Sequence, residues 1–236
     1  MDDYRWFDFQ GTRMEERYPS WNWLLGAREW VAGFQQGAPA FADPAAASAW
    51  LNSIRTAQPT RPRRRCPRVF VSHRQIDDAV ARRLAWLACQ ERFDHWVDLI
   101  DLDPARNPQV KLMEGVLGRW LTAFELSVLT AGIIEMALLN CTHVLAAITA
   151  NAAGSLWIPY QYGRAKDVFP MTTQAACWFD GTKVKRTDLA EYLHLGAVHV
   201  DERAIRRWLA NELTRFPNCK IPPGQWPDDE PQPLPA

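Results

Sequence analysis

The sequence predicts an α/β fold, and two observations support this class. Between Arg68 and Phe216, short apolar runs alternate five times with segments of helical periodicity. The first run, RVFVS at Arg68–Ser72, is apolar and β-branched over nearly its whole length, as expected for a strand buried on both faces of a parallel sheet. Five alternations with right-handed crossovers predict a flavodoxin-like, five-stranded parallel sheet covered by helices on both faces.

Residues 1–67 are predicted to form a helical extension that ends in a linker. Ser20 suits the N-cap of a helix over Trp21–Gln35, where apolar residues have helical spacing. A second, alanine-rich helix is expected over Ala45–Arg55. The stretch Pro59–Pro67 carries four arginines among prolines and predicts a solvated linker, because proline lacks an amide donor and the arginines repel one another.

The main domain is expected to span residues 68–216. The predicted strands are Arg68–Ser72, His95–Asp98, His143–Thr149, Ala175–Phe179 and Ala197–Val200. The predicted helices are Asp77–Phe93, Leu112–Leu121, Leu126–Leu139, Ser155–Asp167, Thr187–Leu193 and Asp201–Phe216, the last capped by Asp201. The proline-rich tail, residues 217–236, is predicted to be poorly ordered.

Composition argues against several function classes. Lys+Arg and Asp+Glu number 27 each, so net charge gives no reason to expect a nucleic-acid or membrane partner. The N-terminus is polar and acidic, unlike a signal peptide, and no apolar run reaches the length of about 18 residues that a membrane span needs. The five cysteines form no C-x-x-C pair, which argues against a zinc site and a disulfide framework. A cytoplasmic protein without a metal is therefore expected.

The segment Ser155–Asp167, SLWIPYQYGRAKD, is the most informative part of the chain. Ser155 can cap its start, and Pro159 is tolerated because it falls in the first turn. Trp157 and Gln161 are four residues apart and share one helix face. The small residue Gly163 would allow close approach of another backbone. The alternative interpretation is an ordinary amphipathic helix with a core tryptophan.

Polar residues also follow the first two predicted strands. Ser72, His73 and Arg74 end the first strand, and Asp98 and Asp101 follow the second. Parallel α/β sheets bind ligands at the carboxyl ends of their strands. The sequence contains neither G-x-G-x-x-G nor G-x-x-x-x-G-K-[ST], so the usual dinucleotide and P-loop phosphate cradles are absent.

Two segments resemble the TIR (Toll/interleukin-1 receptor-like) domain family. The run VFVSHRQIDDAVARRLAWLACQERFDHWVDL resembles the start of such a domain, with its strand, Ser-His turn, helix and Trp-x-Asp second strand. The strand HVLAAIT followed by S-x-W-x-x-x-x-x-G-x-A resembles the third strand and following helix of bacterial TIR proteins. The resemblance covers about Arg68–Phe216, and residues 1–67 have no part in it.

The resemblance implies a function. Many bacterial and plant TIR domains cleave the nicotinamide–ribose bond of NAD⁺, and some convert the ADP-ribose into a signalling nucleotide. In antiphage systems such as Thoeris, a separate effector reads that product. The chain would then be an NAD⁺ glycohydrolase or ADP-ribosyl cyclase of the hydrolase class, with NAD⁺ as substrate and no cofactor. Self-association through TIR surfaces is also implied.

The family's catalytic residue is a glutamate in S-x-W-x-x-x-E, and the matching position here is Gln161. A carboxylate at the ribose hydroxyls stabilises the oxocarbenium-like transition state. Glutamine keeps the shape but can neither carry the charge nor accept a proton. Three readings are open: a substitution that disables an active enzyme, a natural non-catalytic domain that binds a nucleotide or a partner protein, or another acid in the catalytic role.

The resemblance also assigns the neighbouring residues. Ser72, His73 and Arg74 would border the nucleotide pocket, with Arg74 able to pair with a pyrophosphate; a turn-stabilising His73 is the alternative. Asp98 and Asp101 would contact ribose or nicotinamide, or cap their loop. Trp157 would shield the cleft or lie buried beneath the helix, and Tyr160 is the better candidate to face substrate. Trp96 is assigned to the core, and His143, His194 and His199 to structural positions.

Two function classes follow from these assignments. The first is the NAD⁺-cleaving enzyme, active with glutamate at position 161. The second is a non-catalytic TIR module that assembles with other TIR domains or binds nucleotide. A weaker third option is another nucleoside-processing enzyme of flavodoxin-like fold, such as a deoxyribosyltransferase, which also holds a glutamate at a ribose.

Overall fold

The computed structural model describes residues 67–97, 141–167, 174–219 and 230–235, together with scattered positions between 120 and 138. By their contacts, residues 64–99 and 138–236 belong to one compact unit, and residues 100–137 belong to another. The sheet and its helices lie in the first unit, which is described below by itself. The helices and linker predicted for residues 1–66 lie outside the described residues.

The described chain alternates strands and helices as predicted. Its elements are β1 (Arg68–Ser72), α4 (Asp78–Gln90), β2 (Asp94–Val97), β3 (His143–Ile148), α7 (Trp157–Asp167), β4 (Ala175–Phe179), β5 (Ala197–His199) and α8 (Glu202–Leu213). Short 3₁₀ helices are η3 (Gln75–Asp77), η4 (Ala150–Ala152), η5 (Arg186–Asp188) and η6 (Glu191–Leu195).

The five strands form one sheet in the order β2-β1-β3-β4-β5, and every neighbouring pair is parallel. β1 therefore lies between β2 and β3, with Val71 opposite Val97 on one side and Leu145 on the other. This is the flavodoxin-like sheet that the sequence predicts. Such an order reverses direction between β1 and β3, so the carboxyl ends of these two strands form the edge where doubly wound sheets bind ligands.

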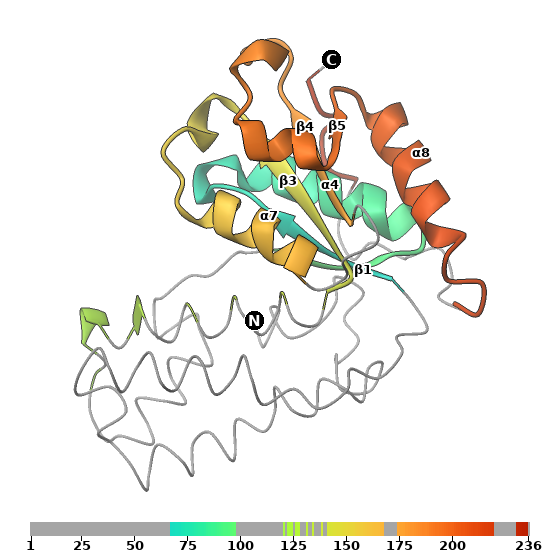
Figure 1. Ribbon diagram of the computed structural model, residues 1–236, viewed down its shortest axis with the longest axis horizontal. Helices are drawn as coiled ribbons and strands as arrows, with labels where there is room; N and C mark the ends of the chain where they lie inside the picture. Colours follow the sequence, from blue (N-terminus) through green and yellow to red (C-terminus); the bar gives the residue numbers. More distant parts are fainter. Residues whose placement is uncertain are drawn as a thin grey trace, which may run out of the picture. The chain divides into compact units, whose positions relative to one another are not determined.

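Helices cover both faces of this sheet (Figure 1). One face packs against α4 and α8 through a single apolar cluster that includes Val69, Leu145 and Trp178 of the sheet. The alternate residues of β1, Phe70 and Ser72, point to the opposite face. There α7 packs on β1, β3 and β4, with Ile158 and Tyr162 fully buried.

Several predicted boundaries need correction. The segment Thr187–Leu193 is two 3₁₀ turns, η5 and η6, rather than one helix. The helix predicted over Asp77–Phe93 ends earlier, at Gln90, where Arg92 adopts a positive φ of 68° and turns the chain into β2. The predicted caps are confirmed: Asp201 accepts a hydrogen bond from the Ala204 amide at 2.8 Å, and Ser155 accepts one from the Ile158 amide at 3.3 Å.

The predicted helices Leu112–Leu121 and Leu126–Leu139 fall almost wholly outside the described residues. Among the scattered positions there, the helical ones are Ala123, Phe124, Leu126, Ser127, Ala131, Ile134 and Leu138. These positions agree with a helix in the second of the two predicted segments and leave the first untested.

Two expectations about the chain's end and its thiols are wrong in part. Residues 230–235 of the tail are not loose: Leu234 is buried against the cluster under α4 and α8. Cys89, Cys141 and Cys177 are buried and not disulfide-bonded, and burial raises the pKa of the Cys177 thiol to about 12. Cys219, by contrast, is disulfide-bonded, which the spacing of the cysteines did not indicate.

Within the described ranges, no helix is long and apolar enough to span a membrane. The same residues contain no cluster of three or more histidine, cysteine or carboxylate side chains that could hold a metal ion.

Gly196 is a position where the fold requires glycine. A Cβ atom placed there would collide with the Tyr162 hydroxyl and the Ala175 carbonyl, both held in place by the packing of α7 and β4. Tyr162 is itself fixed by donating a hydrogen bond to the Leu193 carbonyl at 3.0 Å. We expect Gly196→Ala to lower the free energy of unfolding by about 2 kcal/mol, as overpacking does.

Gly163→Ala provides the matched control for this prediction. Gly163 lies in α7, and no described atom would come within 4 Å of its added Cβ, so the close backbone approach expected from the sequence is not seen. This change should stabilise the helix by about 0.5–1 kcal/mol. Urea denaturation of both variants checks the pair, and equal effects would contradict the account of Gly196.

Three buried or partly buried histidines should make the fold sensitive to acid. Burial lowers the pKa values of His73, His143 and His199 from their ordinary value of 6.5. For His143, Glu212 opposes this shift and Arg215 adds to it. Below pH 6.5 the unfolded chain therefore binds protons that the folded chain does not. As the pH is lowered, the free energy of unfolding decreases by up to about 1.4 kcal/mol per pH unit for each histidine.

Urea midpoints at several pH values between 7.5 and 5 check this expectation. His143→Gln should reduce the slope of stability against pH, because one of the three histidines is removed. His194→Gln, at an exposed position, should leave the slope unchanged. A slope that stays the same in His143→Gln would show that acid acts through other groups.

Candidate functional site

The two segments that carry the predicted site meet at one hydrogen bond. The hydroxyl of Ser72, at the end of β1, donates to the Oε1 atom of Gln161, in the second turn of α7. The two residues are 89 positions apart, and their exposed fractions are 0% and 1%. The side chains therefore meet inside the protein, between the carboxyl end of β1 and the helix that covers that face of the sheet.

Local structure explains why these side chains face each other. Ser72 follows Phe70 on the α7 face of β1, because side chains alternate along a strand. Gln161 lies on the buried side of α7 together with Ile158 and Tyr162, three residues before it and one after. The hydrogen bond from Ser72 satisfies the carbonyl oxygen of this buried glutamine.

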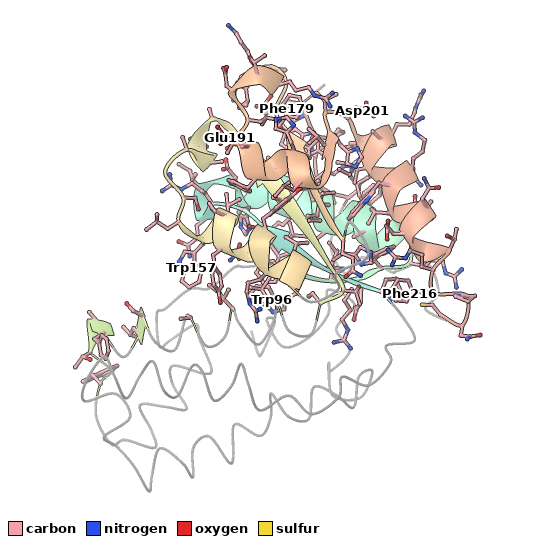
Figure 2. The ribbon with its side chains drawn as sticks, in the orientation of Figure 1. Trp96, Trp157, Phe179, Glu191, Asp201 and Phe216 are labelled. Atoms are coloured by element: carbon pink, nitrogen blue, oxygen red, sulfur yellow. The ribbon has the colours of Figure 1, made fainter. Side chains whose placement is uncertain are left out.

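Trp157 departs from the expectation that it lies beneath the helix. Its exposed fraction is 39%, and Figure 2 shows it on the side of α7 away from the sheet. Its ring meets that of Tyr160, itself 41% exposed, edge to face, with the centroids 5.8 Å apart. The contact of Tyr160 with substrate stays a prediction. Gln161, in contrast to Trp157 and Tyr160, is buried.

Arg74 and Asp77 join the loop after β1 to the loop after β3. The Nη1 atom of Arg74 donates to the carbonyls of Asn151 at 2.8 Å and Ala153 at 3.1 Å. The carboxylate of Asp77 accepts from the Thr149 hydroxyl at 2.7 Å and from the Asn151 amide at 2.8 Å. Arg74, expected to bind a pyrophosphate, thus uses this nitrogen to position the loop that leads into α7.

His73 is buried, with an exposed fraction of 7%, and neither ring nitrogen has a hydrogen-bond partner among the described residues. Burial lowers its pKa, while Asp78, the Val71 carbonyl and Asp77 act in the opposite direction. The ring is therefore neutral at pH 7.

The remaining predicted residues divide into two groups. Asp98 and Asp101 lie outside the described residues. Trp96 is a core residue, as predicted: it is 6% exposed and its ring centroid lies 4.8 Å from that of Phe70. His143 is structural too, since Thr142 and Glu212 hydrogen-bond its two ring nitrogens at 2.7 and 3.2 Å.

No sequence pattern indicates Asp77, Thr149 and Asn151, although these residues fix the loops around Ser72. Their hydrogen bonds join positions 72 and 74 residues apart. A polar residue in a loop carries no periodic pattern, so only the folded chain reveals the pairing.

One cavity lined by described residues lies along α8, away from Ser72 and Gln161. It measures about 500 Å³ and is lined by Glu91, Glu202, Arg203, Arg206, Arg207 and Ala210. Ser72 and Gln161 are themselves buried. The arrangement offers buried hydrogen-bonding groups, and Gln161 supplies no charge and cannot take up a proton.

A comparison of the chain with protein-family models, with curated proteins and with solved structures found no significant match.

Proposed function

We propose that this chain is a TIR-like module that binds NAD⁺ or an ADP-ribose-type nucleotide beside Gln161 and cleaves it slowly or not at all. The single observation that carries this proposal is the Ser72–Gln161 hydrogen bond. It brings together the two segments that resemble the TIR family, at the carboxyl ends of β1 and β3, where doubly wound sheets bind nucleotides.

The chemistry of position 161 sets the expected activity. A ribose hydroxyl could replace Ser72 as the hydrogen-bond partner of Gln161, so that binding keeps the same shape as in the family's active enzymes. The step that needs a negative charge at the ribose would be missing, because a carboxamide is neutral. Since Gln161 is 1% exposed, the ligand can reach it only when a neighbouring segment moves.

Nucleotide binding to the full chain tests the proposal. Titration calorimetry should show binding of NAD⁺ and ADP-ribose, and Gln161→Leu should weaken it at least about tenfold, or 1.4 kcal/mol. Gln90→Leu, at the opposite end of the sheet, should bind as the wild type does. Absence of binding at millimolar nucleotide, in a chain shown to be folded, would refute the proposal.

A second candidate function is an interaction module, and a separate observation favours it. Four large apolar side chains are exposed around the same loops: Ile76 (77%), Leu156 (87%), Trp157 and Tyr160. Such a group is typical of a contact surface for another protein. Self-association that rises with concentration and is lost in Leu156→Asp would support this function, whereas a monomer at all concentrations would count against it.

A further inference from the structure

The last described segment of the chain, Glu230–Pro235, makes specific contacts with α4 and α8. Arg83 of α4 donates from Nη1 to the Glu230 carboxylate at 2.7 Å and to the Pro231 carbonyl at 2.8 Å. The Leu234 amide donates to Glu202 of α8 at 2.7 Å. Polar side chains of two helices therefore form hydrogen bonds with both ends of this short segment.

An apolar anchor accompanies these hydrogen bonds. Leu234 is 8% exposed and belongs to the cluster that α4 and α8 form with the sheet. Ile205, Trp208 and Leu209 of α8 belong to the same cluster. Burying a leucine side chain contributes substantially to the binding of a segment of only six residues.

The side chains of α4 and α8 that contact the segment are held in position by one another. Arg83 is 6% exposed and pairs with both oxygens of Glu202, through Nε at 2.7 Å and Nη2 at 2.8 Å. Its guanidinium also lies 4.1 Å from the centre of the Trp86 ring. Arg83 lowers the pKa of Glu202, so the carboxylate that accepts from Leu234 stays charged. These contacts with Glu202 and Trp86 fix the guanidinium group of Arg83 in the position where it binds Glu230.

The segment has the character of a peptide ligand. Its sequence, EPQPLP, contains three prolines in six residues and forms no helix or strand. Proline-rich segments are already extended, so they lose little conformational entropy on binding. The acidic residue precedes the leucine by four positions, which matches the placement of Arg83 and the apolar cluster.

We propose that the groove between α4 and α8 is a peptide-recognition site, and that Glu230–Pro235 is its ligand, able to bind as a separate peptide. Ten residues, 220–229, join this segment to Cys219. Because the segment belongs to the same chain, its binding is intramolecular, so it excludes weaker peptides until it is released.

A full-length chain with a weakened segment tests this inference. Leu234→Asp removes the apolar anchor and opens the groove. The probe is a labelled peptide of residues 228–236, DDEPQPLPA, followed by fluorescence anisotropy. Leu234→Asp should bind the peptide at least tenfold more tightly than the wild type, whose own segment competes. A peptide carrying Leu234→Ala should bind at least tenfold more weakly than the native peptide.

Two outcomes would overturn the inference. One is a folded Leu234→Asp chain that does not bind the peptide, and the other is equal binding to wild type and variant, which would indicate a different surface. If Leu234→Asp is unstable, the peptide must raise its melting temperature in a concentration-dependent manner. No rise, or an equal rise with a scrambled peptide, would also overturn it.

Discussion

Gln161→Glu is expected to increase nicotinamide release from NAD⁺ by about 10² to 10⁴-fold, the usual range for a positioned acid or base group. The glycosidic bond breaks through a transition state with positive charge on the ribose, which a nearby carboxylate stabilises. The shape of the site would not change, because glutamate and glutamine are nearly isosteric. Charge is the single property that the substitution adds.

Ser72 influences whether the new carboxylate is charged, and therefore whether it can stabilise the transition state. Its hydroxyl already donates to Oε1 of Gln161, and it can donate to a carboxylate oxygen in the same place. That hydrogen bond favours the charged form, whereas burial of position 161 disfavours it. Cleavage by Gln161→Glu should therefore increase as pH rises through the pKa of the new glutamate, and Ser72→Ala in the same background should shift that profile to higher pH.

Nicotinamide release, with the nucleotide product identified by mass, is the measurement. Gln90→Glu makes the same chemical change at the end of α4, on the opposite edge of the sheet, and should leave the rate at the wild-type level. A Gln161→Glu variant that binds NAD⁺ and leaves it intact would contradict the catalytic part of the proposal. If neither form binds NAD⁺, the interaction module becomes the better account.

The sheet could be predicted because its signal is local. β1 and β4 match the predicted ranges at both ends, since fully buried parallel strands are read as continuous apolar runs. The segment Thr187–Leu193 was misread because a helix propensity over seven residues does not distinguish an α-helix from 3₁₀ turns. Of the two positions expected for Trp157, shielding the cleft or lying beneath the helix, burial is wrong, because the first turn of α7 leaves this side chain partly exposed.

The candidate site was predictable only as two separate segments. Resemblance selected Ser72 and Gln161, but their hydrogen bond depends on how α7 packs over β1. The role of Arg74 could not be predicted, because its partners are the backbone carbonyls of Asn151 and Ala153, which have no sequence signature. The docked tail was missed for the same reason: prolines indicate an extended chain but not the arginine that receives it.

Arg83 joins segments that are far apart in the sequence. Replacing it should therefore destabilise the fold more than any other substitution proposed. It pairs with Glu202 and Glu230, 119 and 147 residues away, while itself nearly buried. Arg83→Met would keep the apolar stem but leave Glu202, 24% exposed, without its charged partner. We expect a loss of about 3 kcal/mol in the free energy of unfolding, the lower end for broken buried pairs because Glu202 is partly solvated.

The neighbouring arginine provides the control. Arg82 pairs with Asp78 at 3.0 Å, but both side chains are more than a third exposed, so Arg82→Met should cost no more than about 0.5 kcal/mol. The double variant Arg83→Met/Glu202→Leu should recover part of the loss, because an apolar pair can replace a buried ion pair at little cost. Urea denaturation measures all three. Equal losses for Arg82→Met and Arg83→Met would mean that the tail and α8 are held by apolar packing, with the buried arginine contributing little.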